Sequence, residues 1–288
     1  MIRDLTIQGY RRFKDFHIDG LARVNLLVGP NNSGKTSFLE AVYMLVGQDK
    51  HLRLAETLYH RDELSEPPKS RRLSDTLDSG ASYQIEHIFY GHELKRGQKI
   101  KLQSRQEEPR LLEIQLKSKR DSSTPTSLYF SDGGIALQIG SGGAAHIQRR
   151  ADPFAPTHYG PFIPGNGLSV DEMAHLWDRI TLSPQEENVV KALQIIEADV
   201  ERISFTSRRN TMSRILVKLR GQNAPIPLSS MGDGMRRILA LAMLAAVAED
   251  DFMFVDEIDT GLYYETQIDM WRLLIETAQR LNVQIFAT

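Results

Sequence analysis

The chain has 288 residues, of which 41% are hydrophobic and 25% are charged, with a net charge of −2 and no cysteine. This composition is typical of a globular protein; no apolar run approaches the roughly 18 residues of a membrane span, and the charged N-terminus is not a secretory signal. The lack of cysteine excludes disulfides and thiolate metal sites and favours a cytoplasmic location, while the near-neutral charge limits nucleic-acid binding to a local surface.

The N-terminal residues predict a hairpin, a buried strand and a helix. DLTIQGYRRFKDFHID alternates apolar and polar residues over two strands with a tight connection, and VNLLV, residues 24–28, is typical of a buried strand. TSFLEAVYMLV then predicts a helix that places Phe38, Leu39 and Val42 on one face.

Between this strand and this helix lies GPNNSGKT, which has the pattern G-x-x-x-x-G-K-T. Gly29 and Gly34 permit backbone angles that a Cβ atom would forbid, so the loop can wrap a phosphate with its N–H groups pointing inward. Lys35 brings a cation to the β- and γ-phosphates, the Thr36 hydroxyl can bind magnesium, and the helix dipole favours the same anion. A chance glycine-rich turn is the alternative. We predict a nucleotide-binding loop that comprises Gly29, Pro30, Asn31, Asn32, Ser33, Gly34, Lys35, Thr36 and Ser37.

The middle of the chain predicts loops, a sheet and a hinge, in that order. Residues 48 to about 80 are polar, contain Pro67-Pro68 and predict an exposed helix with loops. Residues 81–148 hold repeated short alternating runs such as SYQIEHIFY, QKIKLQS and LLEIQLKS, which predict an antiparallel β insertion. Residues 152–168 are rich in proline and glycine and predict a hinge.

Two helices are predicted in a helical segment at residues 160–200. Ser169 and Glu172 have the spacing of a capping box, as do Ser183 and Glu186, where a proline takes the first helical position.

The C-terminal part predicts a hairpin, a helix, a strand, a second helix and a final strand. ERISFTS and RILVKLRG form the hairpin, and LSSMGDGMRRILALAMLAAVAED is a turn that enters a long apolar helix. DFMFVDE is typical of a short buried strand, TQIDMWRLLIETAQRL of an amphipathic helix and VQIFAT of a strand. Trp177 and Trp271 lie at helical apolar spacing and are predicted to be core residues.

Two sets of residues in this C-terminal part are candidates for catalysis or ligand binding. Asp256 and Glu257 end an apolar strand, and successive strand residues point to opposite sides, so we expect different roles for them. Asp256 is assigned to the magnesium shell and Glu257 to the attacking water, with two solvated surface acids as the alternative. Residues 230–233 begin the long helix and offer a hydroxyl and N–H groups to an anion; the alternative is a simple capped helix.

In this order and spacing, GPNNSGKT, LSSMGDGMRR and FMFVDEIDTGL resemble the heads of ABC-type ATPases, in particular the RecF/SMC-like and OLD-family branch of AAA family ATPases. IQGYRRFKDFHI resembles the N-terminal strands of that branch, and the resemblance covers residues 1 to about 47 and 160–288. It implies an α/β fold, a P-loop NTPase of ABC-ATPase head type, with a mixed sheet core, a helical subdomain and a signature and Walker B half at 225–288. The antiparallel β subdomain at 81–148 is predicted from its own alternating pattern and not from the resemblance.

The resemblance also implies roles. Ser230 and Gly232 match the signature residues that contact the γ-phosphate bound to a partner chain, so ATP and Mg²⁺ are expected to bring two chains together. Asp256 matches the metal-shell acid, which adds to the magnesium ligand already predicted at Thr36.

Glu257 matches the catalytic acid of the family, and Asp259 lies in the expected dimer-contacting loop. Together with Lys35 of the glycine-rich loop, Glu257 is the expected catalytic residue. Met231 departs from the small residue usual in the signature. In the family, a switch histidine follows the strand that VQIFAT matches, so we expect residues 1–288 to be a truncated head.

Weaker signals concern a glutamine and a basic stretch. Gln138 and Gln148 are candidates for the glutamine that completes the metal shell. Residues 94–120 hold nine Lys or Arg against three acids; these predict a DNA contact through residues 95–120, or, more commonly, a sheet edge protected by lysines.

The leading functional hypothesis is an ATP-hydrolysing switch that dimerises on ATP and acts in DNA repair or phage defence, with a nuclease or other effector as a further partner. The alternative is a nucleotide-gated scaffold that binds ATP and a protein partner with little turnover. A P-loop kinase is a third interpretation, which the signature motif disfavours.

Overall fold

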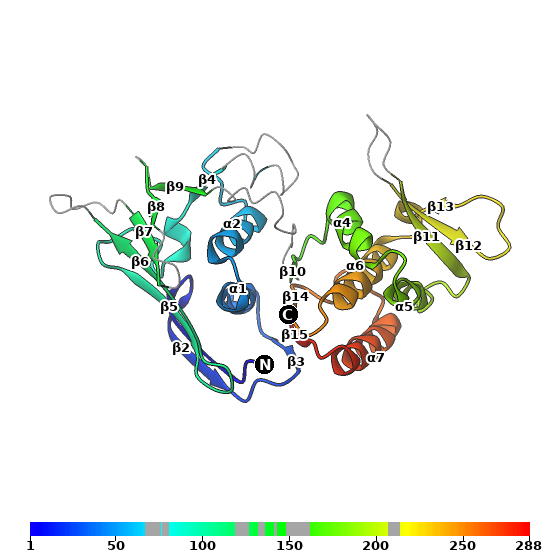
Figure 1. Ribbon diagram of the computed structural model, residues 1–288, viewed down its shortest axis with the longest axis horizontal. Helices are drawn as coiled ribbons and strands as arrows, with labels where there is room; N and C mark the ends of the chain where they lie inside the picture. Colours follow the sequence, from blue (N-terminus) through cyan, green and yellow to red (C-terminus); the bar gives the residue numbers. More distant parts are fainter. Residues whose placement is uncertain are drawn as a thin grey trace. The chain divides into compact units, whose positions relative to one another are not determined.

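The computed structural model describes residues 1–66, 76, 81–118, 127–131, 136–140, 143–147, 162–206 and 214–288 (Figure 1). The chain forms two compact units: unit 1 comprises residues 1–22 and 28–160, and unit 2 comprises residues 23–27 and 161–288.

Three features predicted from the sequence lie outside the described residues: the Pro67-Pro68 loop, Gln148 and residues 152–161 of the predicted hinge. Within the described ranges, no helix is both long and apolar enough to cross a membrane.

Unit 1 contains an antiparallel sheet whose order, over the described residues, is β2-β1-β5-β6-β7-β8. Its strands are β1 (Asp4–Tyr10), β2 (Phe13–Asp19), β5 (Lys99–Ser104), β6 (Arg110–Lys117), β7 (Ser127–Phe130) and β8 (Ala136–Gln138). Alternate residues of β5 are buried, because alternate side chains of a strand point to the same face of the sheet. The predicted antiparallel sheet is confirmed, and the predicted N-terminal hairpin joins it where β1 pairs with β5.

The run SYQIEHIFY differs from the single strand that its alternation indicates. It forms a short strand, β4 (Ala81–Gln84), which pairs with β9 (Ala144–Ile147), and then a 3₁₀ turn, η1 (Glu86–Ile88).

Two helices of unit 1 follow one another, α1 (Lys35–Val46) and α2 (Lys50–His60). Helix α1 contacts β1, β5 and β6, and residues 37–45 are all buried, which confirms the predicted helix. The expectation of an exposed helix after residue 48 is wrong for α2. Its residues Leu54 and Leu58 are completely buried because the helix packs against α1, β4 and β9.

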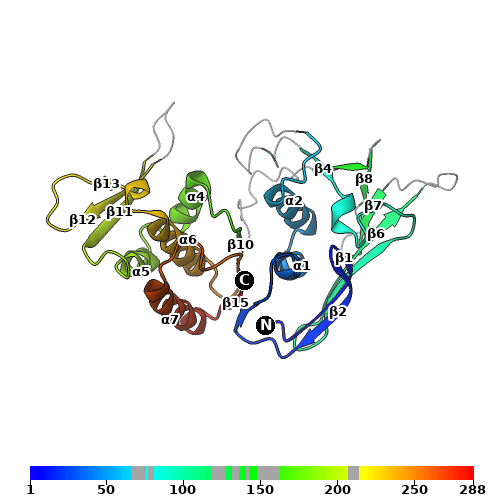
Figure 2. The ribbon, with the colours of Figure 1, turned by 180° about the vertical axis from the view of Figure 1, so that it is seen from behind.

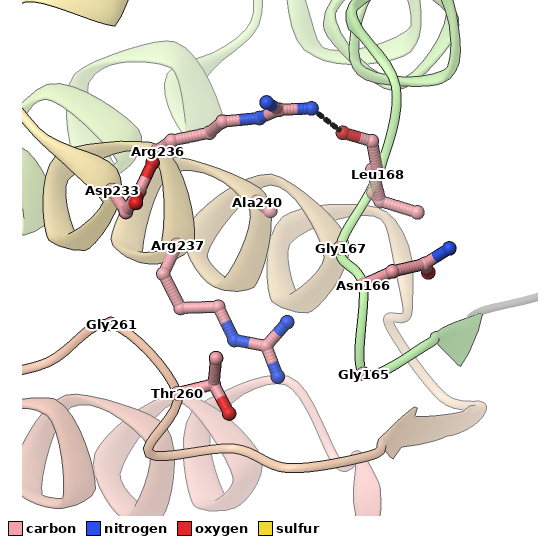
Figure 3. A pocket seen from close by; sticks show the side chains of 10 residues that line it. All are labelled: Gly165, Asn166, Gly167, Leu168, Asp233, Arg236, Arg237, Ala240, Thr260 and Gly261. Atoms are coloured by element: carbon pink, nitrogen blue, oxygen red, sulfur yellow. Dashed lines mark hydrogen bonds between the residues drawn. The ribbon is translucent and has the colours of Figure 1, made fainter.

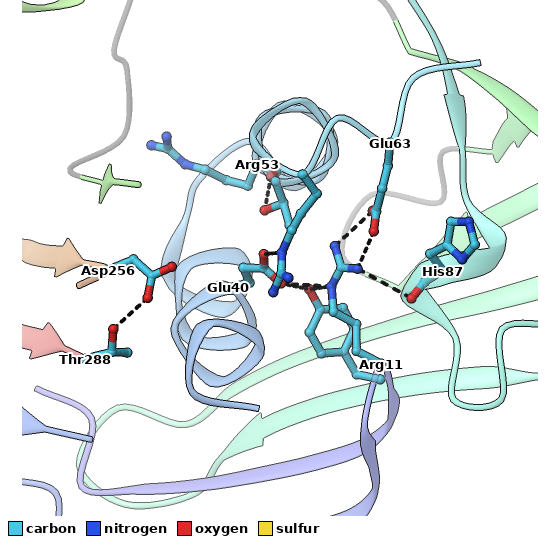
Figure 4. Close-up of polar contacts among 10 residues, drawn as sticks. Arg11, Glu40, Arg53, Glu63, His87, Asp256 and Thr288 are labelled. Carbon is cyan, nitrogen blue, oxygen red and sulfur yellow. Dashed lines mark hydrogen bonds and ion pairs between the residues drawn. The ribbon is translucent and has the colours of Figure 1, made fainter. Parts of the chain in front are cut away.

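A buried network of charges connects the β1–β2 turn to these two helices (Figure 4). Arg11 donates two hydrogen bonds to the carboxylate of Glu63, at 2.7 and 3.0 Å, and its Nε lies 2.8 Å from Glu40 Oε2. Glu40 also accepts from Tyr10 Oη and from Arg61 Nε, at 3.0 and 2.6 Å. Burial alone would lower the pKa of Arg11, but Tyr10 and the two carboxylates raise it, so the guanidinium stays charged.

Unit 2 contains a parallel sheet in the order β10-β14-β15-β3 over the described residues. The strands are β10 (Phe162–Ile163), β14 (Phe252–Val255), β15 (Gln284–Ala287) and β3 (Val24–Leu26). All residues of β14 and β15 are buried, as their continuous apolar runs predict. The predicted strand VNLLV is shorter than expected and is an edge strand with partly exposed residues, rather than a buried one.

The strand register aligns the carboxyl ends of these strands. Val255, Ala287 and Leu26 are neighbours in one row. Asp256, Thr288 and Leu27 come directly after these strands, so they lie at the same edge of the sheet.

In the described residues, the rest of unit 2 consists of four α-helices and a small antiparallel sheet. The elements are α4 (Val170–Ile180), α5 (Pro184–Leu193), β11 (Val200–Thr206), β12 (Arg214–Leu219), β13 (Ile226–Pro227), η2 (Leu228–Ser230), α6 (Asp233–Val247) and α7 (Tyr264–Arg280). Figure 2 shows α6 between α4 and α7, and it contacts both of them as well as α5. Trp177 is buried in the core of this unit and Trp271 packs against it, as predicted.

The two predicted helix starts differ in their chemistry. Ser169 and Glu172 form a reciprocal capping box at α4, which confirms the prediction. At α5, Ser183 accepts from the N–H of Gln185, while the Glu186 carboxylate accepts from Leu182 N–H, so the spacing there does not produce a capping box.

Candidate nucleotide site

The glycine-rich loop lies in unit 1 and begins two residues after Leu27, whose N–H donates to Ala287 O at 2.8 Å within the parallel sheet of unit 2. The loop turns directly into α1 at Gly34, which has φ of 100° and precedes Lys35. A Cβ atom at Gly34 would lie 3.0 Å from the Phe13 ring, so both the backbone angle and the space require glycine. Strand, loop and helix therefore occur in the predicted order.

Lys35 lies across this loop. Its Nζ donates to the carbonyl oxygens of Gly29 and Pro30, at 2.9 and 3.1 Å. Residues 28–33 are exposed, so a ligand can reach the loop. The ammonium can exchange neutral carbonyls for charged phosphate oxygens, which form stronger hydrogen bonds. Thr36 is half-buried at the helix start, and Ser37 is buried below it.

The two acids of unit 2 have different environments. Strand β14 ends at Val255, Asp256 is buried, and Glu257 is exposed. Glu257 has φ of 51°, in the left-handed region, which costs a non-glycine residue about 1–3 kcal/mol and persists only where the surroundings impose it. The contacts that impose it are those of Thr288 and Arg237.

Thr288 bridges the two acids from the neighbouring strand (Figure 4). Its hydroxyl donates to Asp256 Oδ1 at 2.6 Å and accepts from the backbone N–H of Glu257 at 2.8 Å. The sequence interpretation gave this residue no role. The signal that points to it is a hydroxyl side chain directly after a strand that pairs in parallel with the acidic strand.

Arg237 on α6 contacts the same turn from another side. Its Nη2 donates to the carbonyl oxygens of Asp256 and Glu257, at 2.6 Å each. Burial lowers the pKa of Arg237, although Asp256, Glu257 and Asp259 act in the opposite direction. The sequence interpretation missed this residue too, and its signal is a basic side chain at the start of an apolar helix.

The side chain of Glu257 rests against the segment after β10. A Cβ atom at Gly165 would lie 3.1 Å from Glu257 Cδ, so a larger residue there would displace the carboxylate. The Thr260 hydroxyl donates to Glu257 Oε2 at 3.3 Å.

The predicted signature residues surround the start of α6. Ser230 ends the short turn η2, and Gly232 is the N-cap residue of α6 with φ of 88°. Both residues are exposed. Met231, the departure from the family pattern, is partly buried and packs against the core, so its side chain is directed away from the surface of the motif. Gly261, in the loop that contains Asp259, lies against the start of α6. A Cβ atom added at Gly234 of α6 would lie 3.0 Å from the carbonyl oxygen of Gly261.

A pocket of about 290 Å³ lies beside this helix start (Figure 3). It is lined by Gly165, Asn166, Gly167, Leu168, Asp233, Arg236, Arg237, Ala240, Thr260 and Gly261. Arg236 closes one side by donating to Leu168 O at 2.5 Å. The acidic and basic groups of the lining do not define a ligand.

The predicted residues fall into two sets. Lys35 and the phosphate loop belong to unit 1, with the exposed Gln138 at the end of β8, whereas both acids and the signature belong to unit 2. In the described residues, no group of three or more His, Cys, Asp or Glu side chains could hold a metal ion.

These features define the class of protein. A glycine-rich loop follows a parallel strand, two acids end a buried strand of the same sheet, and a glycine-initiated helix contacts the acidic turn. This is the fold of an ABC-type ATPase head with a P-loop.

Comparison of the sequence with models of known protein families shows the family of this chain. The family model of the AAA ATPase domain matches residues 1–127 and 170–288. The chain therefore belongs to the AAA ATPase domain family and is of the RecF/SMC-like type.

Particular relatives agree with this assignment. The chain is 22% identical over 328 residues to the ATP/GTP phosphatase of Helicobacter pylori, covering 100% of this chain and 85% of that protein. It is 41% identical over 94 residues to the DNA replication and repair protein RecF of Thermomicrobium roseum, covering 31% of this chain and 24% of that protein. An SMC head bound to the C-winged helix domain of ScpA has a TM-score of 0.56 at 13% identity, covering 100% of this chain and 89% of that chain, which shows the fold alone.

Proposed function

We propose that the chain binds ATP with Mg²⁺, hydrolyses it and associates with a second copy of itself around the nucleotide. The observation that supports hydrolysis is the position of Glu257, an exposed acid in a left-handed turn whose backbone is held by Thr288 and Arg237. A simple nucleotide-binding loop does not require such an acid.

Each residue has a part in this proposal. Lys35 binds the β- and γ-phosphates, and the loop N–H groups surround them. Thr36 and Asp256 would hold Mg²⁺, which neutralises phosphate charge when bound. Glu257 accepts a hydrogen bond from the attacking water and orients it toward the γ-phosphate.

The exposed helix start of α6 supports association of two chains. Ser230 offers a hydroxyl, and the N-terminus of α6 offers N–H groups and the positive end of a 15-residue helix dipole. We propose that this surface binds the γ-phosphate held by the partner chain. The dimer then depends on the γ-phosphate and separates after hydrolysis.

Replacing Lys35 by alanine tests nucleotide binding. A charge-assisted contact of about 1.5–3 kcal/mol is lost, so the affinity for ATP is expected to fall about 10- to 100-fold. Titration of labelled ATP measures this change, and Lys14→Ala, an exposed lysine on β2, is the matched control. Equal affinities in the wild type and Lys35→Ala would remove the phosphate-loop assignment.

The alternative function, a nucleotide-gated scaffold with a protein partner, predicts the same result for Lys35→Ala. The two functions differ in their expected turnover. If the chain is a scaffold, the wild type binds ATP but releases phosphate no faster than Glu257→Gln. Measured phosphate release therefore separates the two proposals.

DNA is the partner that the RecF relatives support, since those proteins are named for DNA replication and repair. We propose Lys99 and Lys101 on β5 as the contacts. Lys99 is exposed, and Lys101 is half-exposed opposite Glu113 in the strand register. Two other basic residues of this stretch are already engaged: Arg110 pairs with Glu108, and Lys117 lies over the Tyr129 ring. Action in phage defence and a nuclease partner stay predictions.

Charge reversal at Lys99 and Lys101 tests the DNA contact. Binding to duplex DNA is expected to weaken with salt, with a slope of about −0.9 per phosphate contact, and the double reversal is expected to flatten this slope by about two contacts. Fluorescence anisotropy over a salt series measures it. A slope that is unaltered by the reversal would contradict the DNA contact and favour the alternative, in which these lysines protect the sheet edge.

A further inference from the structure

Arg237 is a buried cation in an apolar helix. The residue is only 6% exposed, and Met235 and Ile238, its neighbours along α6, are buried in the core of unit 2. A buried guanidinium is unfavourable unless its N–H groups find acceptors, so its acceptors show what it stabilises. Arg236, the preceding residue, is exposed and donates to Leu168 O.

The acceptors of Arg237 are backbone carbonyl groups of the acidic turn. Nη2 lies 2.6 Å from both Asp256 O and Glu257 O, and Nη1 lies 3.5 Å from Pro164 O (Figure 3 shows the guanidinium directed away from α6). Two successive carbonyl oxygens therefore converge on one nitrogen atom. The positive charge offsets the repulsion between them and stabilises the turn.

The turn determines where the carboxylate of Glu257 lies. Its N–H is held by Thr288, and its carbonyl oxygen is held by Arg237. With both sides of the residue held at φ of 51°, the side chain leaves the backbone toward Gly165 and Thr260. A rotation of the peptide group would move the carboxylate away from both.

We propose that Arg237 is a positioning residue for hydrolysis: it fixes the peptide groups of Asp256 and Glu257 so that the Glu257 carboxylate has one orientation toward the attacking water. The proposal rests on the proposed ATP hydrolysis. Helix α6 would then have two roles. Its N-terminus would contact a phosphate, as proposed above, and Arg237 would affect the rate of the chemical step. The effect is expected in kcat, because Arg237 holds the backbone carbonyl oxygens of the turn that carries Glu257.

Three variants test the proposal in the full chain. Arg237→Met removes the donors and keeps much of the side-chain volume, and Arg237→Lys keeps the charge but reaches fewer carbonyls. Arg236→Met is the matched control on the same helix. We expect kcat for ATP to fall about 10- to 100-fold in Arg237→Met, because small displacements of a reacting group cost rate, with Kd for ATP within about twofold of the wild type. Arg237→Lys is expected to be intermediate and Arg236→Met to resemble the wild type.

A second measurement does not depend on turnover. Hydrogen exchange of the peptide that covers residues 254–262 is expected to be faster in Arg237→Met than in Arg236→Met, because the turn has lost its donor. A wild-type kcat in Arg237→Met, or an equal loss of kcat in Arg236→Met, would overturn the proposal. If Arg237→Met does not fold, a wild-type kcat in Arg237→Lys would overturn it as well.

The failure of ATP hydrolysis itself is distinguishable. In that case the wild type releases no phosphate, and the proposed function is wrong. Unchanged hydrogen exchange of residues 254–262 in Arg237→Met would then overturn the positioning of the turn independently.

Discussion

Glu257→Gln is expected to reduce ATP hydrolysis by about 100- to 10,000-fold, the usual contribution of a general base, while ATP binding is retained. Glutamine has the same shape, and its amide oxygen can still accept from Thr260, but it lacks the charge that orients water. Because ATP then persists, the γ-phosphate-dependent dimer should accumulate. Phosphate release and light scattering after size-exclusion chromatography, with ATP and Mg²⁺, measure the two effects.

Two further variants make this result specific. Glu276→Gln changes an exposed acid on α7 and is expected to hydrolyse ATP like the wild type. Ser230→Arg places a large side chain at the start of α6 and is expected to prevent the dimer while each monomer binds ATP. The dimer proposal is wrong if both the wild type and Glu257→Gln stay monomeric at saturating ATP, and a wild-type hydrolysis rate in Glu257→Gln would remove the assignment of Glu257.

Arg11→Met is expected to destabilise unit 1 by about 3–5 kcal/mol, the usual cost of removing one partner of a buried ion pair. The substitution removes two hydrogen bonds from Glu63 and one cation from the buried carboxylate of Glu40. Because Glu40 is on α1, the helix that begins at the phosphate loop, the loss affects the support of that helix. Urea unfolding followed by circular dichroism measures the free energy.

Arg12→Met is the control for this prediction, since Arg12 is the next residue of the same turn and is exposed. We expect its effect to be within about 0.5 kcal/mol of zero, as for surface substitutions generally. Equal unfolding free energies for the two variants would show that the buried network does not stabilise the unit.

The sequence was sufficient to predict those parts that depend on local patterns. Gly34 and Lys35 belong to a loop whose chemistry requires neighbouring residues in a fixed order, and the apolar strand before Asp256 is equally local. The helices α1, α4, α6 and α7 and the hairpin β11–β12 were predicted because their apolar periodicity and start signals are short-range properties. The resemblance to a known family added the roles of distant motifs.

Contacts between distant residues were not predictable in this way. Thr288 and Arg237 act on the acidic turn from positions 32 and 20 residues away, through hydrogen bonds that no spacing rule describes. The burial of α2 was missed for a related reason, because its polar composition hides a narrow apolar face that packs on α1, β4 and β9. At Ser183 the spacing was right, but the hydroxyl found a nearer N–H at Gln185.

The pairing of β3 with β15 has a consequence for biosynthesis. Residues 24–26 pair with residues 285–287, so this edge of the parallel sheet closes across a separation of about 260 residues. Pairings of such high contact order form slowly and, on a ribosome, must wait until both partners have emerged. The loop that follows Leu27 therefore acquires its fixed strand after nearly all of these residues have been translated. Nascent chains are expected to be unable to retain ATP until that stage, which protects unfinished protein from premature engagement.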